Sequence, residues 1–158
     1  MEENASVNLN TLFSPSEKLH IDNQLKIKHI GEKCESSLDY RGILKDQSTG
    51  VFGGVIYVDQ QAENTQSNMT NRNLLLSDHA RINTKPVLEI YNEDVQCTHS
   101  ATSGRVDEEK LFYIQSRGIG ESDAMNILIK SFASELVDKI KNSQMKRTFQ
   151  EYLSQKLQ

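Results

Sequence analysis

The sequence has little of what membrane, secreted or nucleic-acid-binding proteins require. No stretch approaches the roughly 20 consecutive apolar residues that span a bilayer, and the first residues lack the basic and apolar regions of a signal peptide. The 18 basic residues are outnumbered by 22 acidic ones, which leaves a net charge of -4 and no basic footprint for a nucleic acid. Two cysteines, Cys34 and Cys97, are too few for a disulfide framework and fit a reducing compartment. We therefore expect a cytoplasmic protein with neither a membrane nor a nucleic acid as its partner.

The motifs of common catalytic sites are also missing. Gly50, Gly53 and Gly54 are not followed by the Gly-Lys-Ser/Thr that cradles phosphates, which excludes a Walker-type ATPase. Neither Gly-x-Ser-x-Gly nor His-Glu-x-x-His occurs, and the carboxylates are scattered over polar stretches. With 158 residues, of which 36% are hydrophobic and 25% charged, the chain can still bury a sizeable core. The composition indicates a globular, non-catalytic protein.

Residues 21–105 read as an all-β region, preceded by a loosely ordered lead-in over 1–20. Asn-Gly and Asp-Gly hairpin turns are absent, which argues against an antiparallel meander. A polar stretch with four asparagines (Asn64, Asn68, Asn71 and Asn73) is typical of stacked coils of a parallel β-helix, where side chains at equivalent corners form ladders. No strict hexapeptide period occurs, so the pattern alone is equally compatible with a sandwich. Expected strands cover 25–29, 37–44, 51–58, 73–76, 87–91 and 95–98.

Residues 106–158 read as a helical region. Asp107 opens a short helix with acidic residues in its first turn, and Gly118 ends it. Ser122 is the expected N-cap of a second helix. The apolar stripe of that helix consists of Ala124, Leu128, Phe132, Leu136 and Ile140, widened by Met125, Ile129, Ala133 and Val137. A weaker amphipathic helix follows, with Met145, Phe149, Tyr152, Leu153 and Leu157.

The best candidate for chemistry is the pair Cys97 and His99 at the end of the last expected strand. Residues two apart on a strand point to one face, about 6 to 7 Å apart, so a thiolate and an imidazole could reach one soft metal. Zinc or an iron-sulfur cluster needs about four donors, and the local sequence supplies no more. Taken alone, the pair is more often structural than metal-binding.

The other histidines and the second cysteine are interpreted as structural or solvated residues. Cys34 lies in a region with no other ligand and is expected to be a small buried hydrophobe. Asp78 and His79 are interpreted as a hydrogen-bonded pair at a strand corner rather than a catalytic dyad. His20 and His29 have no companions in sequence and are expected to be solvated or core residues.

Several long motifs, in order, resemble the SufB/SufD scaffold proteins of the SUF iron-sulfur cluster assembly system. The resemblance runs from about residue 20 to 141, and Cys-Thr-His followed by Ser-Ala-Thr is more similar to SufD than to SufB members. Family members are usually more than twice this long, so the chain matches their C-terminal part, either as an excised fragment or as a natural short protein. The motifs are YRGIL (40–44), GVF (50–52), NRNLLLSDHA (71–80), TKPVLEIY (84–91), DVQCTHSAT (94–102) and DEEKLFYIQSRGI (107–119).

The resemblance implies a right-handed parallel β-helix followed by a C-terminal helical segment. It implies a non-catalytic scaffold that pairs with a SufB-like subunit, or with itself, through the β-helix and docks a SufC-like ATPase, to which any ATPase activity belongs. Cys97 and His99 match positions where a transient cluster or iron is shared with the partner. An interaction solenoid with no cluster-binding role remains the alternative, and the plastid stroma replaces the cytoplasm in a plant or alga. The positions that match the ATPase-facing segment are Leu111, Tyr113, Arg117, Gly118, Ile119 and Ala124.

Overall fold

The computed structural model describes residues 1–156, with side chains as far as Ser154. The chain divides into two compact units, Met1–Gly104 and Arg105–Gln158. Each unit is described by itself.

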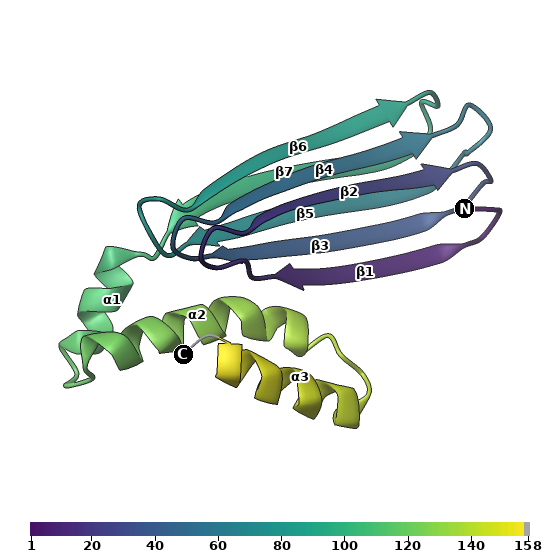
Figure 1. The fold of residues 1–158 in the computed structure, drawn as a ribbon. Coiled ribbons are helices and arrows are strands. Elements are labelled where there is room, and N and C mark those ends of the chain that lie inside the picture. The colour runs from purple at the N-terminus through teal and green to yellow at the C-terminus, as the bar shows by residue number, and fades with distance from the viewer. Residues whose placement is uncertain (157–158) are drawn as a thin grey trace. The chain divides into compact units, whose positions relative to one another are not determined.

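The first unit is a parallel β-solenoid of about three turns. Successive strands alternate between two sheets, so that each full turn adds one strand to each sheet (Figure 1). The larger sheet has the order β1-β3-β5-β7 and the smaller one β2-β4-β6, with parallel pairing. This confirms the β-helix and excludes the sandwich. The strands are β1 Ser6–Phe13, β2 His20–His29, β3 Glu35–Leu44, β4 Thr49–Val58, β5 Thr65–Leu75, β6 Arg81–Ile90 and β7 Val95–Arg105.

The turns of the solenoid differ in length. In the larger sheet Ser6 pairs with Glu35, and Glu35 pairs with Gln66. The second turn therefore contains more residues than the first. In the smaller sheet His20 pairs with Thr49, and Thr49 pairs with Arg81, so the second turn again contains more residues than the first. Because the period is long and varies from turn to turn, no short repeat is visible in the sequence.

The N-terminal segment is a strand, not the loosely ordered lead-in that the sequence predicts. Every residue of β1 pairs with a residue of β3. At the end of β1, the ring of Phe13 lies 5.1 Å from that of Tyr40. The apolar residues of β1 alternate only as far as Leu9, since Leu12 and Phe13 are adjacent, and the strand that pairs with β1 lies a full turn of the solenoid further along the chain.

The asparagine stretch lies mostly within a strand rather than at corners. Asn64 does occupy a corner, with φ of 55°, and its N–H donates to the Asp94 carbonyl of the next turn at 2.8 Å. Asn71 and Asn73 instead point into the solenoid from β5, where both are buried and Asn73 donates to the Asn71 amide oxygen at 2.9 Å. These inward amides make β5 look polar, which is why the sequence predicts only its end at 73–76.

The core of the solenoid is closely packed around Gly42. A Cβ built on Gly42 would lie 2.4 Å from Phe13 Cε1 and 2.7 Å from Asn73 Oδ1. The neighbouring Tyr40 ring stacks on Phe52 with centroids 4.2 Å apart, which leaves Phe13 little room to shift. The buried cluster consists of Leu38, Tyr40, Phe52, Ile56, Val58, Ala62 and Met69.

We expect Gly42→Ala to lower the free energy of unfolding by about 1 to 3 kcal/mol, because overpacking forces a neighbouring side chain out of its rotamer. Urea denaturation followed by circular dichroism measures the change. Gly104→Ala is the matched control, since a Cβ there meets nothing within 4 Å. Equal midpoints for the two variants would contradict the packing argument.

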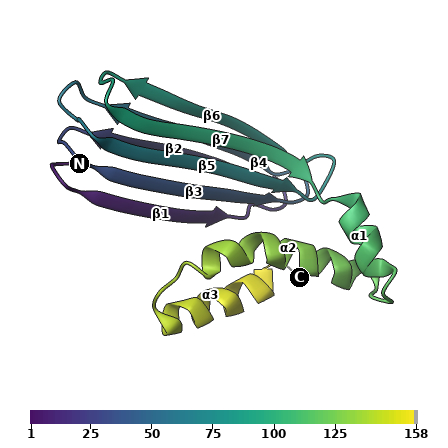
Figure 2. The ribbon, with the colours of Figure 1, turned by 180° about the vertical axis from the view of Figure 1, so that it is seen from behind.

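The second unit contains three helices within residues 105–156: α1 Glu108–Gln115, α2 Glu121–Val137 and α3 Ser143–Lys156 (Figure 2). Asp107 caps α1 by accepting from the N–H groups of Glu109 and Lys110, and Gly118, with φ of 87°, follows its end as predicted. The N-cap of α2 is Gly120, so the prediction of Ser122 is wrong. None of the helices in residues 1–156 is long and apolar enough to cross a membrane.

The buried residues of α2 follow the predicted stripe only in part. They are Ala124, Ile129, Ala133, Leu136 and Val137, whereas Leu128 and Phe132 are half-buried and Ile140 lies beyond the end of the helix. The last expected helix is confirmed as α3, with Leu153 buried and Met145 and Tyr152 exposed. Leu157 lies outside the described residues.

Candidate functional site

Cys97 and His99 lie on β7, the terminal strand of the larger sheet. Cys97 is half-buried and packs against the core cluster, whereas His99 is exposed. Burial raises the pKa of the Cys97 thiol, and a hydrogen bond with the Ser67 backbone acts in the opposite direction. Since residues two apart on a strand share a face, the thiol and the imidazole start from the same side of β7.

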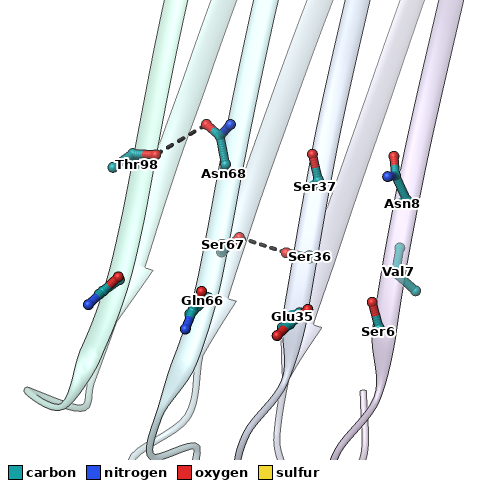
Figure 3. Close-up of a pocket in the computed structure, with 11 residues that line it drawn as sticks. Ser6, Val7, Asn8, Glu35, Ser36, Ser37, Gln66, Ser67, Asn68 and Thr98 are labelled. Atoms are coloured by element: carbon teal, nitrogen blue, oxygen red, sulfur yellow. Dashed lines mark hydrogen bonds between the residues drawn. The ribbon is translucent and has the colours of Figure 1, made fainter. Parts of the chain in front are cut away.

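Two hydrogen bonds define how β7 lies against β5. Thr98 donates to the Asn68 side chain at 3.1 Å, as Figure 3 shows, and Asn73 donates to Ser103 at 3.2 Å. The two pairs have the same separation along the chain, so the same register places Ser67 beside Cys97. The Cys97 side chain therefore continues an inward column of small side chains from the preceding turns.

That column is a chain of buried polar groups. Ser67 Oγ lies 2.6 Å from Ser36 Oγ, which lies 2.9 Å from His29 Nε2 (Figure 3 shows the two serines). His29 is fully buried, and its Nδ1 has no hydrogen-bond partner among the described residues. Burial, assisted by the N-terminal charge of the chain, lowers the pKa of His29.

Sequence reasoning missed this column and assigned His29 only as a solvated or core residue. The three side chains come from β2, β3 and β5, and the variable period hides which of their positions align. Hydroxyl side chains that point inward at equivalent positions of successive turns are the signal from which this column could have been predicted.

No group of three or more His, Cys, Asp or Glu side chains that could hold a metal ion occurs in the described part of the chain. Cys97 and His99 thus bring at most two of the roughly four donors that zinc or an iron-sulfur cluster takes. Further donors would have to come from outside the described residues.

The remaining candidates from the sequence lie apart from this pair. The Cys34 thiol is fully buried and donates to the backbone carbonyl of Glu2 at 2.9 Å, which is a structural role. Asp78 and His79 are exposed in the loop between β5 and β6, and His20 is exposed at the start of β2.

A polar groove crosses the outer side of the larger sheet. It is lined by side chains from four strands, among which Asn8, Ser37, Asn68 and Thr98 form a row in Figure 3. Glu35 is the one carboxylate among the lining residues, so the groove holds no acid-base pair.

The α1 region carries the other group of predicted site residues. Tyr113 is 59% exposed, and the Arg117 guanidinium lies over its ring at 4.8 Å and donates to its hydroxyl at 2.8 Å. Gly118 is exposed, and Leu111 and Ile119 are half-buried. Phe112, which precedes Tyr113 in α1, is 72% exposed.

Ala124 behaves differently from its predicted companions. Its side chain is fully buried in the first turns of α2. It therefore cannot itself contact a protein that docks on this surface.

These features define a parallel β-solenoid with a helical C-terminal unit and, on the last strand of its larger sheet, the candidate ligand pair Cys97 and His99. Residues 1–132 match the family model described as "SUF system FeS cluster assembly, SufBD core domain", and the chain belongs to this family.

Several relatives are similar over much of the chain. The iron-sulfur cluster assembly protein SufD of Escherichia coli is 38% identical over 155 residues, which are 98% of this chain and 37% of that protein. An iron-sulfur cluster assembly SufBD family protein of Synechocystis is 42% identical over 101 residues, 64% of this chain and 22% of the relative. The protein ABCI7, chloroplastic, of Arabidopsis thaliana is 40% identical over 96 residues, 61% of this chain and 20% of the relative. The chain thus spans well under half of the length of these relatives.

Proposed function

We propose that this chain is a SufD-like, non-catalytic scaffold component of iron-sulfur cluster assembly. It pairs with a SufB-like subunit, or with a second copy of itself, through the solenoid and docks a SufC-like ATPase through the helical unit. The observation that carries the proposal is the 38% identity to a SufD protein across 98% of the chain, within a family of cluster assembly proteins. The cluster, or its iron, is the cargo of the scaffold and not a resident cofactor.

The pairing argument starts from the edge of the larger sheet. β7 is the last strand in the order β1-β3-β5-β7, so one of its edges has no neighbouring strand within residues 1–156. Such an edge is a template for another chain. A partner seated there would come close to Cys97 and His99 and could add the donors that they lack.

The docking argument rests on the exposed aromatic surface of α1. Phe112 and Tyr113 are 72% and 59% exposed, and aromatic and arginine side chains dominate the energetics of protein interfaces. Arg117 already holds the Tyr113 ring in place, which lowers the entropy cost of binding.

We expect Tyr113→Ala to weaken binding of a SufC-like ATPase by roughly 30-fold, the effect of a typical interface hot spot. Isothermal titration calorimetry measures the dissociation constant. Tyr152→Ala is the control, because Tyr152 is a similarly exposed tyrosine, at 53%, on α3. Unchanged affinity for Tyr113→Ala, or an equal loss for Tyr152→Ala, would contradict the assignment of the surface.

The proposal as a whole is tested by anaerobic reconstitution. The chain is mixed with a SufC-like ATPase and a SufB-like subunit, separated by size exclusion, and the eluted complex is assayed for iron, sulfide and ATPase rate. Co-elution with stimulated ATPase and bound iron supports the scaffold. Co-elution without Cys97-dependent iron supports an interaction solenoid with no cluster-binding role, and failure to co-elute overturns both.

The proposed compartment is a reducing one, the cytoplasm or the plastid stroma. Two free cysteines, one of them half-buried, fit such a compartment. The Arabidopsis relative is named as chloroplastic.

A further inference from the structure

A polar pocket at the end of the smaller sheet where β4 and β6 begin has no part in the proposed function. It is lined by Gln47, Thr49, His79 and Arg81. Thr49 and Arg81 are the first residues of β4 and β6 and pair with each other in register; Figure 1 shows the two strands side by side. Gln47 precedes β4, and His79 lies in the loop that leads into β6. Two adjacent strands and the loops before them therefore bring the four side chains together.

The four lining side chains are hydrogen-bond donors without partners. A guanidinium, an imidazole, a hydroxyl and an amide can each donate, and none of them carries a negative charge. Within the described part of the chain, none of these side chains forms a hydrogen bond or an ion pair. The pocket therefore offers a set of donors that the protein itself does not use.

The backbone beneath the pocket is fixed by hydrogen bonds between turns. The Thr49 N–H donates to the Leu19 carbonyl of the preceding turn at 2.9 Å, and the Arg81 N–H donates to the Ser48 carbonyl at 3.0 Å. Ser48 itself is fully buried, and its hydroxyl donates to the Lys45 carbonyl at 2.6 Å. The positions from which the side chains start are therefore set before a ligand binds, which lowers the entropy cost of binding.

The charge of the pocket is positive, although the chain as a whole has a net charge of -4. Two acidic residues, Asp46 and Asp78, precede lining residues in the sequence, but neither of them lines the pocket. The Asp46 carboxylate accepts from the Glu17 N–H at 2.8 Å, and Asp78 takes part in an interaction of its own. Because no lining carboxylate neutralises Arg81, the local field favours an anion.

We propose that Gln47, Thr49, His79 and Arg81 bind a phosphate-type oxyanion, either free phosphate or the phosphoryl group of a nucleotide. A guanidinium presents a rigid fork of N–H donors that matches two oxygens of a phosphate. A carboxylate offers only two oxygens, whereas donors from four side chains match the larger oxygen set of a phosphoryl group. The inference goes beyond the scaffold function, because the pocket includes neither the candidate cargo ligands nor the aromatic residues of α1.

The test is a titration of the isotope-labelled full chain with inorganic phosphate, followed by NMR. Chloride keeps the ionic strength constant, which separates binding from screening. We expect the amide signals of Thr49 and Arg81 to shift and to saturate. Arg81→Gln is expected to weaken binding roughly tenfold, because a charged hydrogen-bond donor is lost. Thr49→Val, which removes only the hydroxyl, is expected to weaken binding roughly threefold.

Lys85→Gln is the matched control, because Lys85 is also an exposed cation on β6 but does not line the pocket. It removes the same charge and should leave the dissociation constant within about twofold of the parent value. Equal losses for Arg81→Gln and Lys85→Gln would indicate general charge attraction and overturn the site. A parent titration that does not saturate would also overturn it. Melting temperatures identify any variant that fails to fold, and Thr49→Val then decides.

A second titration with adenosine diphosphate distinguishes the two sources of the phosphoryl group. Tighter binding of the nucleotide than of phosphate, at the same Thr49 and Arg81 signals, supports a nucleotide site, and equal or weaker binding supports a site for free phosphate. Neither titration needs a partner or iron. Failure of the titrations therefore overturns the pocket alone, and failure of the subunits to co-elute overturns the scaffold alone.

Discussion

Cys97→Ala and His99→Ala are each expected to reduce the iron and sulfide recovered with the reconstituted complex by roughly tenfold or more, without preventing the subunits from co-eluting. The reason is the small number of donors. The described residues offer no third His, Cys, Asp or Glu beside this pair, so losing either one removes half of what this chain can contribute. Removal of an outer-shell partner typically costs about 10- to 100-fold in metal affinity, and removal of a ligand should cost at least as much.

Thr98→Val serves as the control for this experiment. Thr98 lies between the two candidate ligands but faces the outer groove, where it bonds to Asn68. It should retain the parent amount of iron. Full iron recovery in both ligand variants would contradict the cargo site, and a loss of co-elution would instead indicate damage to the interface.

The burial of Cys97 and the exposure of His99 illustrate what the sequence could and could not predict. Their spacing correctly indicates one face of a strand. Whether that face is covered depends on the strands opposite, which the local sequence does not contain. The core cluster reaches Cys97 but not His99, so the two groups differ in accessibility although they share a face.

Strands whose inward side chains are apolar could be predicted from the sequence, and strands whose inward side chains are polar could not. β4 alternates throughout and matches the prediction of 51–58 closely. β5 buries Thr65, Ser67 and Asn71, whose hydrogen bonds to neighbouring groups replace apolar contact. A prediction that uses only the alternation of hydrophobic residues assigns such a strand as a loop.

The prediction of the α2 N-cap was wrong for a local reason. Ser122 has the side chain of an N-cap, but Gly118 adopts φ of 87° and Gly120 is extended, so the chain has already turned into the helix at Glu121. The backbone turn at Gly118 therefore outweighed the preference of one serine for the N-cap.

The largest stability effect is expected at a buried ion pair on β3. Arg41 donates from Nε and Nη2 to the two carboxylate oxygens of Asp39, each at 3.1 Å. The two side chains are only 2% and 9% exposed, although they alternate with the core residues Leu38 and Tyr40 along the strand. A bidentate pair in this environment combines charge with fixed geometry.

Arg41→Ala is expected to lower the free energy of unfolding by about 3 to 5 kcal/mol, because it leaves the buried Asp39 carboxylate without this bidentate partner. Urea denaturation at pH 7 measures the change. The double variant Asp39→Leu/Arg41→Met should recover most of the loss, since an apolar pair of similar volume avoids the desolvation of both charges.

The exposed pair Lys26–Glu89 provides the contrast. Its atoms are 2.9 Å apart, closer than those of the buried pair, but its side chains are 42% and 36% exposed. Lys26→Ala is therefore expected to cost no more than about 1 kcal/mol. Equal costs at the two sites, or a double variant as unstable as Arg41→Ala, would show that burial of the charges does not set the effect.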